Sequence, residues 1–72
     1  MSFNLKDKVT VVDTKKIKND IHLEEDAFRI IEKSNYTGEV TKIENGINFV
    51  GFKNDLGWVT QGFKDNEIKG VK

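Results

Sequence analysis

The sequence predicts one small, mainly β domain with a single short helix. Three observations predict this class. The chain has 72 residues, enough for one domain only. Apolar residues recur with a period of two over most of its length, whereas a helical period occurs in one segment only. We expect strands near residues 7–13, 37–44, 46–53, 56–62 and 67–71, and a helix at residues 23–33.

The first strand is predicted by the β-branched run that follows Asp7 and ends at Asp13. Residues 14–22 are mostly polar, with isolated Ile17 and Ile21, and are expected to form a loop.

The helix is predicted by a change of period. Its apolar residues fall at positions i, i+4, i+7 and i+8, on one helical face: Leu23, Ala27, Ile30 and Ile31. Acidic residues 24–26 occupy the first turn and Lys33 the last, the arrangement that the helix dipole favours. Since a helix of about 10 residues is marginal alone, it must dock on another element.

The hairpin around Asn45-Gly46 allows two registers. A two-residue loop pairs Glu44 with Ile47 and Ile43 with Asn48, which mixes polar and apolar residues on each face. A three-residue loop with Gly46 left-handed sorts the side chains better, so we favour its pairs: Ile43 with Ile47, Val40 with Val50, and Lys42 with Asn48.

The favoured register gives the hairpin two apolar faces. Val40, Val50 and Phe52 share one face, and Ile43, Ile47 and Phe49 share the other. One face should line the interior of the domain. The helix at residues 23–33 is the only cover within the chain for the second face, which is otherwise open for a partner.

The strand pattern resembles the SH3-like small barrels, in particular the KOW-type barrels of ribosomal and transcription factors and similar short barrels in phage proteins. The resemblance is carried by Val9–Val12, by the spacing Gly38-Val40-Ile43, by Gly57–Thr60 and by the turn Asp65–Ile68. It implies a five-stranded barrel, from which residues 14–35 depart as a helical insertion between strands one and two. KOW-type barrels contact RNA through a basic loop before that glycine. Residues 34–37 here contain no Lys or Arg.

The composition argues against several classes of function. The chain has 12 basic and 12 acidic residues, without the basic excess usual in a phosphate-binding domain. It has no Cys, which suits a reducing cytoplasm. It has no apolar run long enough for a membrane span. The preference for Lys over Arg and the many Asn and Ile residues resemble bacterial or phage proteins from AT-rich genomes.

Residues with chemical potential are sparse. His22, the only histidine, has no nucleophile beside it in sequence and is expected to be a surface or capping residue. The acids at residues 24–26 point about 100° apart on a helix and cannot converge on one ligand. We therefore expect no catalytic, cofactor or metal site, and no enzyme activity.

Aromatic residues are the best candidates for binding. Trp58 is expected either to pack in the core or to line a ligand surface, which Phe49 and Tyr36 could extend. We expect a non-catalytic interaction module that binds a protein partner. One alternative is a nucleic-acid-binding barrel that uses Lys15, Lys16 and Lys18. Another is a homo-oligomeric structural component, since the sequence leaves the oligomeric state open.

Overall fold

The computed structural model describes residues 3–71 and confirms the mainly β class. Its elements in chain order are β1 (Lys8–Val11), α1 (Thr14–Lys18), α2 (Glu25–Lys33), β2 (Thr37–Glu44), β3 (Ile47–Asn54), β4 (Gly57–Phe63), the 3₁₀ turn η1 (Asp65–Glu67) and β5 (Ile68–Gly70). The predicted helix is α2, and each predicted strand is present with slightly different ends.

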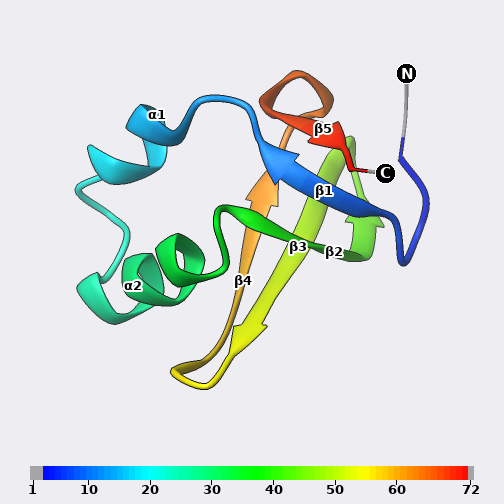
Figure 1. Cartoon of the computed structure of the whole chain (residues 1–72). Coiled ribbons are helices and arrows are strands. Elements are labelled where there is room, and N and C mark those ends of the chain that lie inside the picture. The colour runs from blue at the N-terminus through cyan, green and yellow to red at the C-terminus, as the bar shows by residue number, and fades with distance from the viewer. Residues whose placement is uncertain (1–2, 72) are drawn as a thin grey trace.

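The five strands form one open antiparallel sheet in the order β4-β3-β2-β1-β5. The sheet bends strongly, so that β1 and β5 cross in front of β3 in Figure 1. Apolar side chains from both parts of the bent sheet fill the space between them. With three residues from the helices, the buried apolar residues are Val9, Val11, Ile17, Ile30, Ile31, Val40, Val50, Phe52, Phe63 and Ile68.

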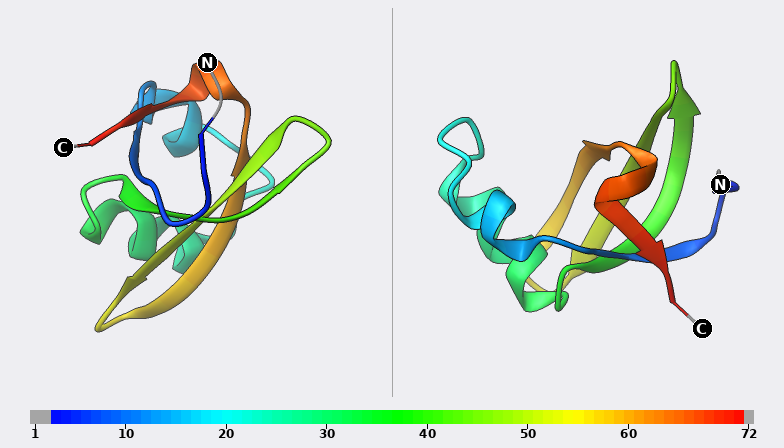
Figure 2. Two further views of the ribbon diagram at one scale, coloured as in Figure 1. Left: turned by 90° about the vertical axis from the view of Figure 1, so that its right-hand side faces the viewer. Right: turned by 90° about the horizontal axis from the view of Figure 1, so that it is seen from above.

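Helix α2 packs on the inner face of the sheet, at the end where β3 turns into β4. Ile30 and Ile31 are its buried residues. The Cδ1 atom of Ile30 lies 3.4 Å from the point where a Cβ on Gly57 would be, so helix and strand are in close contact. Both helices lie at the β4 side of the sheet (Figures 1 and 2).

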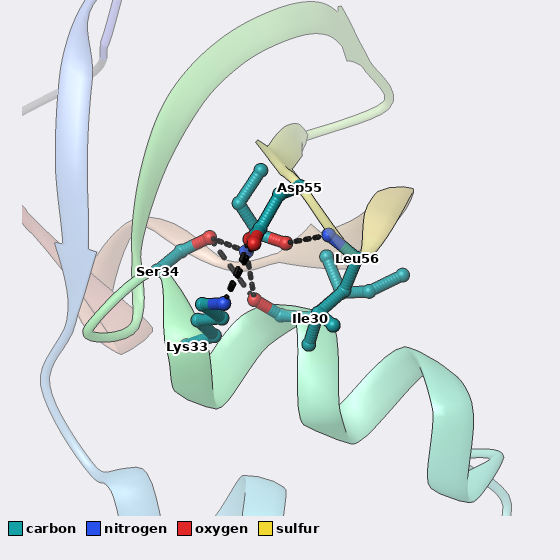
Figure 3. A network of polar contacts seen from close by, with 6 residues as sticks. Ile30, Lys33, Ser34, Asp55 and Leu56 are labelled. Carbon is teal, nitrogen blue, oxygen red and sulfur yellow. Dashed lines mark hydrogen bonds and ion pairs between the residues drawn. The ribbon is translucent and has the colours of Figure 1, made fainter.

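A polar network fixes this contact. The side-chain amide nitrogen of Asn54 donates to the carbonyl oxygen of Ile30 at 2.9 Å and to the hydroxyl of Ser34 at 2.8 Å. Nearby, the ammonium group of Lys33 pairs with the carboxylate of Asp55 at 2.8 Å. Figure 3 shows these groups of α2 and of the β3–β4 turn facing one another. The turn is therefore held to the last turn of the helix.

Part of the segment predicted as a loop is helical. Thr14–Lys18 form α1, which the expectation of a loop over residues 14–22 missed. The carboxylate of Asp13 caps this helix by accepting from the backbone N–H groups of Lys15 and Lys16. Ile17, the only buried residue of α1, anchors it to the core.

The predicted register of the β2–β3 hairpin is wrong at its tip. The loop has two residues, Asn45 and Gly46, both with positive φ (52° and 77°), as a type I′ turn requires. Glu44 therefore pairs with Ile47, and Ile43 with Asn48. A bulge between Val40 and Lys42 then restores the predicted pair of Val40 with Val50.

The corrected register changes one of the two predicted faces. Val40, Val50 and Phe52 share the buried face, as expected. Ile43 does not share a face with Ile47 and Phe49, because it pairs with Asn48, a residue of the buried face. Since it lies near the hairpin tip, Ile43 is nevertheless 41% exposed. That tip extends away from the rest of the domain (Figure 2).

Candidate functional site

The outer face of the β2-β3-β4 sheet, the face turned away from α2 and the core, is the candidate binding surface. Residues paired across an antiparallel ladder point to the same side, and alternate residues of a strand share a face. Phe49 pairs with Gly62, and Lys53 with Trp58, so both aromatic residues lie on this face. Four residues along β3 separate the two positions, a distance of about 13 Å.

Glycines shape this outer face. A Cβ on Gly62 would lie 2.8 Å from Cγ2 of Ile47 and 3.4 Å from the Phe49 ring, so these two side chains cover the bare strand there. Gly51 lies between Phe49 and Lys53 on this face, and because it has no side chain it leaves the strand backbone bare. The result is an apolar end at Phe49 and a depression over Gly51.

The depression is a groove of about 590 Å³ that crosses the three strands. Its lining comes from β2, β3 and β4: Glu39, Thr41, Gly51, Phe52, Lys53, Trp58 and Thr60. Trp58 forms one wall of the groove. We call this set of residues the outer-face groove.

Trp58 is the most exposed aromatic side chain among the residues that the structure describes, at 72%. Its placement excludes the core alternative, because the indole lies outside the buried cluster. A partner that covered a large apolar side chain of this kind would gain about 2–3 kcal/mol from removing it from water.

Phe49 is less available than Trp58. Its ring is half-buried, and the ammonium group of Lys42 lies 5.8 Å from the ring centroid, within the range of a cation–π contact. Lys42 also pairs with Glu44 at 2.7 Å. Phe49 therefore contributes an edge to the apolar surface, while Trp58 contributes its most accessible part.

Tyr36 is not brought together with Phe49 and Trp58. It follows the end of α2, where both Asn35 and Tyr36 have positive φ and reverse the chain into β2. Its side chain packs against the core. Its carbonyl oxygen accepts from the backbone N–H of Val11 at 2.9 Å and from the Thr10 hydroxyl at 3.1 Å. Tyr36 thus joins α2 to β1.

The three lysines of the nucleic-acid alternative lie on α1, away from the outer-face groove. Lys16 pairs with Glu67 across a separate cleft of about 390 Å³ between α1 and the end of β4. The hydrogen bond between them raises the pKa of Lys16 and lowers the pKa of Glu67. The side chains of Lys15 and Lys18 are exposed.

The remaining candidates lie at the surface. His22 is exposed, and its backbone N–H donates to the carboxylate of Asp20 at 2.8 Å. Glu25 pairs with Arg29 one helical turn later. Within residues 3–71, no three His, Cys, Asp or Glu side chains come together as metal ligands would.

Sequence reasoning missed the groove itself. Gly51, Lys53 and Thr60 were not singled out, although strand alternation places all three beside Trp58 once β3 and β4 are paired. Pairing Lys53 with Trp58 from the two-residue turn Asp55-Leu56 is the signal that could have found them.

No family model, no curated protein and no solved structure matches this chain. None of the helices within residues 3–71 combines the length and the apolar character that a membrane crossing needs.

Proposed function

We propose that this protein is a non-catalytic interaction module whose outer-face groove binds a protein partner. The observation that carries the proposal is the 72% exposure of Trp58 on a sheet face that α2 leaves uncovered. Trp is the residue most enriched at the energetic centres of protein interfaces, and its exposure is otherwise costly.

The fold part of the proposal is an SH3-like small barrel of bacterial or phage origin. Its support is the strand order β4-β3-β2-β1-β5 and the 3₁₀ turn just before β5. Small barrels of this kind present aromatic residues to peptide or protein ligands.

Protein is favoured over nucleic acid because of how the charges are placed. Lys16, in the centre of the α1 lysine group, is paired with Glu67. The outer-face groove carries one acid and one base, Glu39 and Lys53, and so offers no basic track for a phosphate backbone.

The test is capture of partners by immobilised protein from a lysate of the producing organism. Trp58→Ser should abolish capture and Phe49→Ser should weaken it. Leu56→Ser removes another exposed apolar side chain, 52% exposed, from the β3–β4 turn outside the groove, and should leave capture unchanged. Circular dichroism must show that every variant is folded. Capture by folded Trp58→Ser at the wild-type level would refute the proposal.

A further inference from the structure

The outer face carries both a projecting side chain and a depression. Trp58 projects from β4, and Gly51 on the neighbouring strand leaves the floor of the groove bare. Gly51 pairs with Thr60, two residues from Trp58, so about 8 Å separates the projection from the depression. A two-fold interface brings the same surface of each copy into contact, so a side chain that projects from this face needs a depression on the same face to receive it.

The charges of the outer face are also compatible with contact between two copies of this face. Its acids are Glu39 and Glu44, and its bases are Lys42 and Lys53. Lys42 and Glu44 neutralise one another within the hairpin. A face without net charge does not repel its own copy, and it does not select a strongly acidic or basic partner.

The available area limits the strength of such a contact. Three strands of seven residues cover about 14 by 23 Å. A standard interface buries about 800 Å² per partner, roughly one seventh of the 5305 Å² surface of this chain. The outer face is smaller than that, so its contact belongs to the weak, concentration-dependent class.

From these features we infer that the partner of the outer face is a second copy of this chain. The two sheets pack face to face about a two-fold axis, and Trp58 of each copy enters the groove beside Gly51 of the other. This inference rests on the proposed function, because it names the partner of the same surface.

Analytical ultracentrifugation gives the first test. The mass should rise from 8.2 kDa toward twice that value as the concentration approaches about 1 mM. Trp58→Ala removes the projection and Gly51→Leu fills the groove. Each should raise the dimer dissociation constant about 10-fold or more.

A Cβ at Gly51 would meet Cγ2 of Thr41 at 3.1 Å. If Gly51→Leu does not fold, Thr60→Tyr fills the groove from β4, where Thr60 pairs with Gly51. Thr41→Lys adds a charged side chain to the β2 side of the groove and should also weaken the dimer.

Mixing the two variants tests the geometry. A Gly51→Leu copy keeps its Trp58, and a Trp58→Ala copy keeps an open groove, so the mixture regains one of the two contacts. Since Trp58 is the only Trp, fluorescence of the mixture reports on the Gly51→Leu copy alone. Titration with Trp58→Ala should shift its emission to the blue. Titration with the Trp58→Ala, Gly51→Leu double variant should not.

A blue shift with the single variant only supports the inference. A wild-type chain that stays monomeric overturns it, as does a dimer unaffected by filling the groove, or a mixture without a shift. A monomer that still captures another protein through Trp58 overturns the inference and leaves the proposed function standing.

Discussion

The side-chain amide of Asn54 on β3 donates to the carbonyl oxygen of Ile30 on α2 at 2.9 Å. This bond, with a second one to Ser34, ties the helix to the inner face of the sheet. The same side chain accepts from the backbone N–H of Leu56 at 2.9 Å. Asn54 therefore links the β3–β4 turn to α2 on the inner face of the sheet, and α2 leaves the outer face uncovered.

Asn54→Asp should destabilise the fold. The carboxylate can still accept from the Leu56 N–H, but it cannot donate, and it faces the Ile30 carbonyl oxygen. We expect a loss of about 1–3 kcal/mol in the free energy of unfolding. Urea denaturation measures it. Asn66→Asp, at an exposed position of η1, is the control, and an equal loss in both variants would refute the role of Asn54.

Gly38→Ala should be more damaging than any other Gly→Ala change in the strands. A Cβ there would lie 2.5 Å from the Gly51 carbonyl oxygen and 2.7 Å from Cγ1 of Val50, with backbone on one side and core on the other. We expect a loss of about 3 kcal/mol.

Gly70→Ala is the matched control for this change, because nothing lies within 4 Å of its added Cβ. We expect the control to stay within about 0.5 kcal/mol of wild type. Thermal denaturation of both variants compares them. Equal melting temperatures would mean that β2 does not approach β3 as closely as the structure has it.

Glu67 should make stability depend on pH in the acid range. A hydrogen bond from Lys16 and another from the backbone N–H of Lys64 lower the pKa of the Glu67 carboxyl. Because its pKa in the folded chain lies below the unfolded value of about 4.3, its contribution is complete above that value. The contribution is lost as the pH falls through the lowered pKa.

The measurement is the free energy of unfolding of wild type and Glu67→Gln at a series of pH values. Wild type should be the more stable at neutral pH, and the difference should shrink in acid. Glu32→Gln, at an exposed position of α2, is the control variant. A wild-type advantage that is constant down to the lowest pH would contradict the assignment.

Local sequence patterns predicted the elements in which apolar residues recur with a regular period. Helix α2 was predicted because its apolar residues run for more than two turns, and the strands because they alternate. Helix α1 was missed because five residues with a single buried side chain, Ile17, show no period. Its only sequence signal is the capping residue Asp13.

The hairpin shows why register was harder to predict. The Asn45-Gly46 turn determines the pairs at the tip, and burial of Val40 against Val50 determines the pairs nearer the core. A uniform register cannot satisfy both, and the chain resolves the conflict with a bulge that the sequence does not mark. The side on which Trp58 lies depends on the pairing of β4 with β3, and its exposure depends on which side of that sheet α2 covers.

The free energy of unfolding of Trp58→Ser tests most directly whether Trp58 serves a partner rather than the core. It should be measured by urea denaturation followed by far-ultraviolet circular dichroism, at low micromolar concentration, where the proposed dimer would be dissociated. We expect a change within about 0.5 kcal/mol of wild type, as for other exposed positions. A loss of about 3 kcal/mol, the value for a buried large side chain, would contradict the central claim.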